Sequence, residues 1–340
     1  MSAFKLTRSP HNPILRPNPA NDWEERVVLN PAAVYEDGVF YLYYRAAGND
    51  KDHLIHIGLA TSQDGVTFTR TSDKPILSPQ EGGFDGGCTE DPRIVTIDGV
   101  TYMTYAYRTY PPGQYWIRSH EPVIDYGVSP NAPGALVENT TATGLAIVEN
   151  KTGIKRLGRI TLSNVDDRDV VLFPDKVNGL YWRLSRPVKW SGDGYPCEQP
   201  AIWINSSDNL MDWDESKTRM LIKGEEWWEA KKIGAGTPPV KTDRGWLMIY
   251  HGVDNDGVYR VGAFMTDLND PTKIIGRTKD FIFQPETDYE TSGIYNGCVF
   301  PTGVVDVDGI LYIYYGAADQ FCCLATCDRD ALVSHVLSVK

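Results

Sequence analysis

The hydrophobic pattern of the chain repeats five times, each time as a short apolar strand, a turn that ends in Gly and an aromatic-rich strand. In the first copy, an apolar segment at 33–35 leads through Glu36-Asp37-Gly38 into the aromatic segment 39–45. Asp-Gly and Asn-Gly pairs supply the positive φ angles that tight β-hairpin turns require. Successive turn glycines are 61, 80, 66 and 64 residues apart, at Gly38, Gly99, Gly179, Gly245 and Gly309. This spacing predicts five β-hairpins at a nearly constant period.

A third strand is predicted after each hairpin, and in several copies a polar turn and a further strand follow it, as at 62–70. The third strands are expected at 55–61, 143–148, 201–204, 260–265 and 322–326. Repeats of this kind are typical of four-stranded blades, and a closed ring of blades leaves no long exposed sheet edge. We therefore expect an all-β, five-bladed β-propeller that forms one domain over residues 1–340. The pattern predicts no amphipathic helix longer than two turns, and only a short helical or irregular loop at 225–232.

The second repeat is longer than the others because of an insertion at about 109–139. The insertion is rich in Pro, Gly and Tyr, as in the run Pro111-Pro112-Gly113. A loop of this composition belongs at one end of a propeller, where long loops gather. The sequence leaves two roles open: a lid over a substrate, and a contact between the subunits of a homo-oligomer.

Composition and charge limit the partners of the protein. Apolar residues make up 41% of the chain, enough for a substantial core, and the net charge of −12 argues against nucleic acid and anionic membranes as partners. No apolar stretch approaches the roughly 18 residues of a membrane helix, and residues 1–21 contain no apolar signal core, so we expect a cytoplasmic protein. The six Cys form no C-x-x-C pair, which predicts buried free thiols and no zinc site.

Charged residues gather where the innermost strands of the predicted blades begin or end. An ordinary core would be apolar there, and several of these charges are cations although the protein is acidic. One such residue alone is more often a surface ion pair or a structural group, but a cluster of cations is costly unless an anion offsets it. Guanidinium forks and a lysine are suited to bind phosphate. The set comprises Arg45, Glu90, Asp91, Arg93, the segment 166–169, Arg186, Lys232, His251 and Asp319.

The segments that carry these charges resemble glycoside hydrolase family 130, which contains mannoside phosphorylases and related β-mannosidases. The resemblance covers nearly the whole chain, from 30–33 to 314–319. It is a strong signal because five matching segments occur in the right order. These segments are Glu90-Asp91-Pro92-Arg93, Val171-Leu172-Phe173-Pro174, Leu184-Ser185-Arg186-Pro187, Lys232-Ile233-Gly234-Ala235-Gly236 and Tyr250-His251-Gly252-Val253.

The resemblance implies a role for each candidate residue. It implies that Asp91 is the general acid, that its proton travels through the 3-hydroxyl of the mannose, and that inorganic phosphate is the co-substrate. It implies neither a cofactor nor a metal. The phosphate would be bound by Arg168, Arg186, Lys232 and His251, and the sugar by Asn30, Arg45, Arg93 and Asp319.

Two features depart from the family pattern and bear on the linkage. Asp169 follows Arg168, where some β-1,4-acting members have Asn, and the insertion at 109–139 is absent from the shorter members. Both departures favour β-1,2-linked over β-1,4-linked mannobiose or mannooligosaccharides as the substrate.

The expected function is therefore an inverting phosphorolysis of a β-mannoside to α-mannose 1-phosphate. An inverting hydrolase needs a base to activate water, whereas phosphate is already an anionic nucleophile that cations can position. Two alternatives remain: an inverting β-mannosidase, in which Glu198 or Glu226 would supply the base, and a non-catalytic propeller that binds glycans or proteins. The retained Lys232 and His251 argue against the hydrolase. The non-catalytic alternative predicts a funnel in which acid and cations do not converge.

Overall fold

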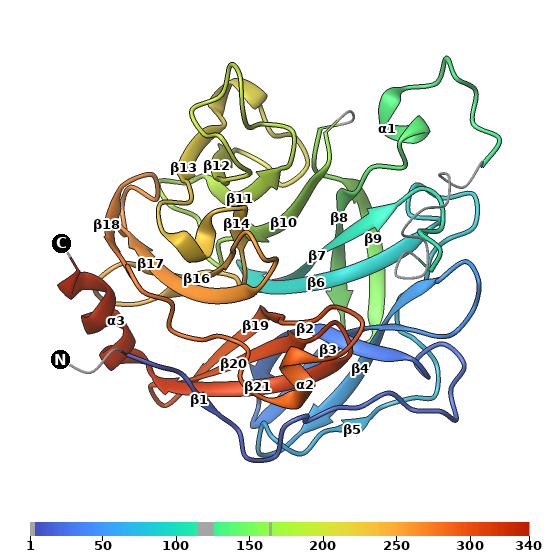
Figure 1. Cartoon of the computed structure of the whole chain (residues 1–340), viewed down its shortest axis with the longest axis horizontal. Helices are drawn as coiled ribbons and strands as arrows, with labels where there is room; N and C mark the ends of the chain where they lie inside the picture. The colour runs from blue at the N-terminus through green and yellow to red at the C-terminus, as the bar shows by residue number, and fades with distance from the viewer. Residues whose placement is uncertain (1–3, 115–125, 163–164, 340) are drawn as a thin grey trace.

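The computed structural model describes residues 4–114, 126–162 and 165–339, and the described chain consists mainly of β-strands (Figure 1). The prediction of an all-β protein is confirmed, and the strands form five successive units.

Unit one contains β2 (Val27–Glu36), β3 (Val39–Ala47), β4 (Ile55–Ser62) and β5 (Thr69–Arg70). Unit two contains β6 (Cys88–Ile97), β7 (Val100–Arg108), β8 (Ala142–Glu149) and β9 (Gly153–Arg159). Unit three contains β10 (Asp167–Leu172), β11 (Tyr181–Pro187), β12 (Ile202–Ser207) and β13 (Arg219–Ile222).

The last two units differ slightly in composition. Unit four contains β14 (Lys232–Ala235), β15 (Val240–Lys241), β16 (Trp246–Val253), β17 (Tyr259–Thr266) and β18 (Ile274–Arg277). Unit five contains β19 (Val299–Val307), β20 (Ile310–Ala317), β21 (Phe321–Asp328) and β1 (Thr7–Arg8). Strand β1 comes from the beginning of the chain and pairs with β21, with Thr7 opposite Thr326. The two ends of the chain therefore meet in one sheet.

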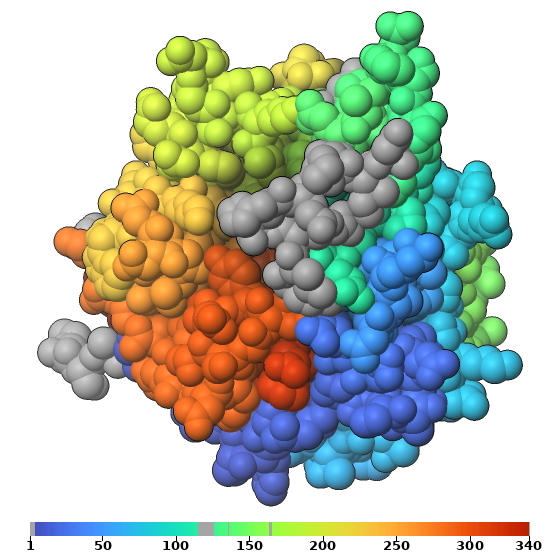
Figure 2. All heavy atoms as spheres, turned by 45° about the vertical axis from the view of Figure 1, so that its right-hand side comes forward, coloured from blue at the N-terminus to red at the C-terminus, as the bar shows by residue number. Residues whose placement is uncertain are grey.

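Contacts between units follow the order of the chain. Strand β2 contacts β6, β6 contacts β10, and β10 contacts β14, while β19 contacts both β16 and β2. Units one and two share one sheet through a short parallel pairing of Ile55 with Cys88. As the order of colours in Figure 2 shows, the units succeed one another around a common centre.

The hairpin turns form as the Gly pattern predicts. In the first turn Asp37 and Gly38 have φ angles of +52° and +80°, so both central residues are left-handed, as a type I′ turn requires. The third strands that were expected at 55–61 and 260–265 correspond to β4 and β17. The loop at 225–232 contains one turn of 3-10 helix, as expected.

One helix is longer than two turns, α3 (Arg329–Ser338) with 10 residues, and the sequence pattern, which predicts no amphipathic helix of that length, does not reveal it. The Asp328 carboxylate accepts a hydrogen bond from the Ala331 N–H at 2.7 Å and so caps the first turn. Leu332, Val333 and Val336 are buried, and α3 contacts β17, β18 and β21. The other helices are short: α1 (Gly134–Val137), η1 (Glu215–Lys217), η2 (Trp227–Glu229) and α2 (Asp288–Thr291). Within the described ranges, no helix has the length and apolar character needed to span a membrane.

A buried polar network recurs in units one, two, four and five, and we call it the Tyr–carboxylate–Arg clasp. A carboxylate that precedes the first strand of the unit accepts hydrogen bonds from a Tyr hydroxyl of the second strand and from an Arg of the outermost strand. The four sets are Glu24, Tyr44 and Arg70; Asp85, Tyr105 and Arg156; Glu229, Tyr250 and Arg277; and Glu290, Tyr315 and Arg8. All four carboxylates are fully buried, and the Tyr and Arg donors help to compensate each of them. Glu24, Glu229 and Glu290 accept further hydrogen bonds from nearby residues. In unit three, Ser185 holds the matching position directly before Arg186.

Candidate active site

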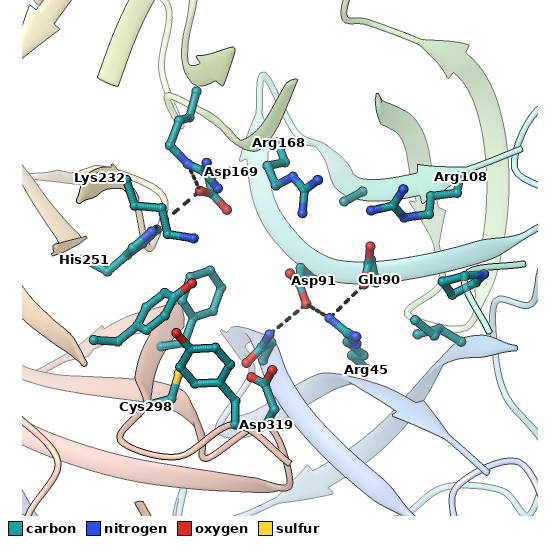
Figure 3. A pocket seen from close by; sticks show the side chains of 18 of the residues that line it. Arg45, Glu90, Asp91, Arg108, Arg168, Asp169, Lys232, His251, Cys298 and Asp319 are labelled. Carbon is teal, nitrogen blue, oxygen red and sulfur yellow. Dashed lines mark hydrogen bonds and ion pairs between the residues drawn. The ribbon is translucent and has the colours of Figure 1, made fainter. Parts of the chain in front are cut away.

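A cavity of about 600 Å³ lies where the units converge, and every unit contributes to its lining (Figure 3). The structure brings together eight of the predicted site residues at this cavity: Asn30, Arg45, Asp91, Arg168, Arg186, Lys232, His251 and Asp319. Arg93 is the exception, because it is buried and does not line the cavity. Its guanidinium donates hydrogen bonds to the carbonyl oxygens of Asp91 at 3.0 Å and of Gly236 at 3.1 Å. Arg93 therefore fixes the backbone that presents Asp91.

Three cavity residues lie at β-bulges in the first strands of their units. The pairing of β2, β6 and β10 shifts register around Asn30, Asp91 and Asp169, respectively. Their φ angles are +45°, +51° and +58°, in the left-handed region that Asn and Asp tolerate better than most residues. A bulge re-aims a side chain next to a site. The same local distortion thus turns an Asn or Asp toward the cavity in three consecutive units.

The carboxylate of Asp91 is held through one of its two oxygens. Oδ1 accepts a hydrogen bond from Asn30 Nδ2 at 2.8 Å and another from Arg45 Nη1 at 3.0 Å. Arg45 Nη1 also lies 2.8 Å from Glu90 Oε2, so Arg45 is shared by two carboxylates. No donor within the described part of the chain contacts Asp91 Oδ2. Asp91 lines the cavity, so this oxygen is the one left to interact with a ligand there.

Asp169 is the centre of a second group of side chains, on the far side of the cavity from Arg45 (Figure 3). Its Oδ2 lies 2.6 Å from Arg186 Nε and 3.7 Å from His251 Nε2, and its Oδ1 lies 3.4 Å from a nitrogen of Arg93. Burial acts to raise the pKa of Asp169, but Arg186, His251 and Arg93 together outweigh burial and lower it. Asp169 is therefore a permanent anion that orients the guanidinium of Arg186.

The packing of this group explains why position 234 is Gly. A Cβ atom there would lie 2.5 Å from Asp169 Oδ2, 2.5 Å from His251 Cε1 and 2.8 Å from Arg186 Nε. Real Cβ atoms do not approach other atoms so closely, so any side chain would displace the group. The Gly of the Lys232-Ile233-Gly234 segment thus has a steric role at the site.

Arg168 is oriented by a carboxylate of its own segment. Arg168 Nε and Nη2 donate to the two oxygens of Asp166 at 2.9 and 2.7 Å, a bidentate pairing that fixes the plane of the guanidinium. Burial acts to lower the pKa of Arg168, but Asp166 outweighs it and keeps the group charged. The half-buried guanidinium lines the cavity with its remaining N–H groups.

Among the described residues, Lys232 forms no ion pair with a carboxylate, and His251 Nε2 lies 3.7 Å from Asp169 Oδ2, beyond hydrogen-bond distance. Burial, supported by the nearby charge of Arg186, lowers the pKa of Lys232 to about 8, so the ammonium form still prevails at neutral pH. Burial lowers the pKa of His251 to about 3, although Asp169 opposes this shift. His251 is therefore a neutral hydrogen-bonding group and not a fourth cation. Both of its ring nitrogens are buried, and neither has a hydrogen-bond partner among the residues that the structure describes.

Asp319 lies in the turn between β20 and β21, with a φ angle of +54°. Desolvation raises the pKa of Asp319 to about 6, while Arg45 acts in the opposite direction. Above pH 6 this carboxyl group is mostly ionised and is a hydrogen-bond acceptor at the cavity. No cluster of His, Cys, Asp or Glu suited to a metal ion occurs within residues 4–114, 126–162 and 165–339.

Sequence reasoning did not identify the residues that complete the wall. Arg108 lines the cavity from the end of β7, two residues beyond Ala106, which is the counterpart of Arg45 in the register of the strands. The other residues are Ile55, Ala106, Pro112, Tyr126, Glu138 and Asn139, and Tyr259, Tyr295, Cys298 and Phe300. The insertion thus contributes directly to the cavity, as the lid alternative predicts, although residues 115–125 lie outside the described chain. Glu198 and Glu226, the candidate bases of a hydrolase, do not line the cavity.

Comparisons with known proteins agree over nearly the whole chain. Residues 5–337 match a family model for glycoside hydrolase family 130, described as beta-1,4-mannooligosaccharide phosphorylase. Two proteins of Thermoanaerobacter sp. (strain X514) are each 36% identical: a 1,2-beta-oligomannan phosphorylase, with 93% of this chain and 95% of that protein covered, and a beta-1,2-mannobiose phosphorylase, with 96% and 98% covered. A Listeria innocua beta-1,2-mannobiose phosphorylase, solved in complex with beta-1,2-mannobiose, shares the fold at a TM-score of 0.77, with 24% identity over 97% of this chain and 99% of that one.

Proposed function

Because the chain belongs to glycoside hydrolase family 130, we propose that it is an inverting β-mannoside phosphorylase that releases α-mannose 1-phosphate. The proposal rests on the cavity, in which Asp91 faces Arg168, Arg186, Lys232 and the neutral His251. Phosphate is the co-substrate, and no cofactor is required. We also propose a cytoplasmic location, because the cytoplasm retains both inorganic phosphate, the co-substrate, and a phosphorylated sugar, the product.

The same proposal includes the architecture: one domain over residues 1–340, built as a five-bladed β-propeller with the cavity on its axis. Support comes from the five successive units, from the contacts between consecutive first strands, and from the pairing of β1 with β21. A ring of this kind collects one or two side chains from each blade at a single site. That arrangement accounts for functional residues spread from Asn30 to Asp319.

In the proposed reaction the phosphate lies against Arg168, Arg186 and Lys232, with His251 as a neutral partner. Asn30, Arg45 and Asp319 bind the mannose whose bond is broken. A phosphate oxygen forms a bond to the anomeric carbon while the bond to the glycosidic oxygen breaks, and Asp91 supplies a proton to the departing oxygen by way of the mannose 3-hydroxyl. Because the nucleophile is already an anion, cations that position it replace the base of a hydrolase.

The proposed linkage is β-1,2. Both Thermoanaerobacter relatives are named for β-1,2-linked substrates, while the description of the family model names a β-1,4 substrate. Asp169 gives this chain a buried carboxylate at a position where some β-1,4-acting members of the family are expected to have Asn. The β-1,2 linkage is therefore the more specific part of the proposal. One experiment tests both the linkage and the reaction.

The direct test is to incubate the protein with β-1,2-mannobiose or β-1,4-mannobiose, each with and without phosphate. Mannose 1-phosphate and mannose are expected in equal amounts, only with phosphate, and faster from the β-1,2 disaccharide. The assay measures both products over time. Rapid release of free mannose without phosphate would refute the phosphorylase and establish a β-mannosidase.

The pH dependence of phosphate use should follow Lys232. Because burial lowers the pKa of Lys232 to about 8, its ammonium charge is present below pH 8 and is lost as the pH rises. We expect kcat/KM for phosphate to fall above pH 8, by up to about tenfold per pH unit for one essential proton. In Lys232→Arg the guanidinium stays charged, so this decline should disappear. A decline that persists unchanged in Lys232→Arg would assign it to another group.

A further inference from the structure

Arg108 is a cavity residue whose guanidinium acts on Asp166 only from a distance, as one of the charges that lower the pKa of that carboxyl group. It ends β7, and its Nη1 donates a hydrogen bond to the carbonyl oxygen of Asn139. No carboxylate in the described parts of the chain forms an ion pair with it. A guanidinium has five N–H donors, so most of its hydrogen-bonding capacity remains for a ligand in the cavity.

The neck of the insertion, which we define as Tyr110, Tyr126, Glu138 and Asn139, is held firmly beside Arg108. The Asn139 side chain exchanges two hydrogen bonds with the backbone of Tyr110, at 3.1 and 2.9 Å. The rings of Tyr110 and Tyr126 stack with their centroids 4.8 Å apart and an interplanar angle of 13°. These contacts tie the two ends of the insertion together. The neck is thus a fixed part of the cavity wall.

The position of Arg108 relative to the proposed phosphate site is informative. Figure 3 shows Arg108 across the cavity from Lys232 and His251, with Asp91 between them. In an inverting displacement the nucleophile and the leaving group lie on opposite faces of the anomeric carbon. If phosphate approaches from the side of Lys232, the sugar that departs must lie on the side of Arg108.

We infer that Arg108 and the neck of the insertion form the subsite for the departing sugar, and that Arg108 selects this sugar by its hydroxyl groups. The inference rests on the proposed function. A planar guanidinium can donate to two neighbouring hydroxyl oxygens, and the Tyr126 ring offers a flat surface for a pyranose. The carboxylates of Glu90 and Glu138 also line the cavity, but Glu90 is paired with Arg45 and Glu138 with Lys189. The departing sugar of the proposed reaction is a mannose, whose neighbouring hydroxyl groups Arg108 would bind.

The inference is tested in the synthetic direction, with mannose 1-phosphate as donor and mannose as acceptor. Arg108→Gln removes a charge-assisted contact, so the KM for mannose should rise by about ten- to a hundredfold. The KM for mannose 1-phosphate should change by less than about threefold, on the scale of ordinary surface effects. Arg219→Gln, a change at an exposed position of β13, serves as the matched control and should leave both values unchanged.

The selectivity for the acceptor sugar distinguishes a direct contact between Arg108 and that sugar from an indirect effect of the substitution on the neck of the insertion. Wild type should discriminate against at least one monodeoxymannose as acceptor, and Arg108→Gln should lose that discrimination. Retention of the same selectivity in Arg108→Gln, or a rise in the KM for mannose 1-phosphate alone, would overturn the inference. Wild-type protein that makes no disaccharide from mannose 1-phosphate and mannose would refute the proposed function instead, and with it the subsite.

Discussion

Replacing Asp91 with Asn is expected to lower kcat for phosphorolysis of β-mannobiose by about a hundredfold or more, the usual scale of general acid catalysis. Asn has nearly the same shape and tolerates the left-handed backbone at this bulge. Its amide oxygen can still accept the hydrogen bonds from Asn30 and Arg45. The amide cannot release a proton, so the fold should persist while the reaction slows. The measurement is kcat at saturating phosphate.

Asp98→Asn is the matched control, because Asp98 follows the other end of β6 with a φ angle of +50° and is exposed to solvent. It should behave like wild type. The deficit of Asp91→Asn should also shrink with a 4-nitrophenyl β-mannoside, whose leaving group departs without a proton. An Asp91→Asn enzyme that degrades mannobiose at close to the wild-type rate would show that another group is the acid.

Lys232→Ala is expected to raise the KM for phosphate by about ten- to a hundredfold, since one charge-assisted contact contributes about 1.5 to 3 kcal/mol. Of the cations proposed to bind phosphate, Lys232 has no close carboxylate partner among the residues that the structure describes, whereas Asp166 and Asp169 partly neutralise Arg168 and Arg186. Removal of the Lys232 side chain should therefore weaken chiefly the binding of phosphate. The KM for mannobiose should change less, and initial rates over a range of phosphate concentrations measure both effects.

The control is Lys231→Ala, which removes the same side chain from the adjacent, exposed position. It should leave the KM for phosphate unchanged. An equal rise of the KM for phosphate and for mannobiose in Lys232→Ala would indicate a general disturbance of the cavity. An unchanged KM for phosphate would remove Lys232 from the phosphate site.

The hairpins could be predicted because their signals are local, since a turn such as Asp37-Gly38 specifies its own geometry. Asp91-Pro92 alone is equally typical of a turn, and the site residues were identified because five segments together resemble glycoside hydrolase family 130. Helix α3 was missed although Asp328 is a regular N-cap residue, because its buried face is short and depends on contacts with β17, β18 and β21. Propensity alone is a weak guide for such a helix.

The electrostatic state of the site could not be predicted, because it depends on distances between units. The sequence suggested four cations, but burial leaves His251 neutral and brings the pKa of Lys232 to about 8. The pairing of Arg186 with Asp169 is close in sequence, yet the approach of Arg93 from another unit could not be inferred. Arg108 was overlooked for a similar reason, since its importance follows only from its place opposite Lys232.

The clasp of unit five has a consequence for how the protein is made. Arg8 and its partner Glu290 are separated by 282 residues, so β1 is made long before the strand with which it pairs. Until β21 has been made, β1 has no strand to pair with and the Glu290 carboxylate lacks the Arg8 donor. Contacts between such distant residues carry a large loop-closure entropy and form late. We therefore expect the sheet of unit five to close later than the sheets whose strands are neighbours in the chain.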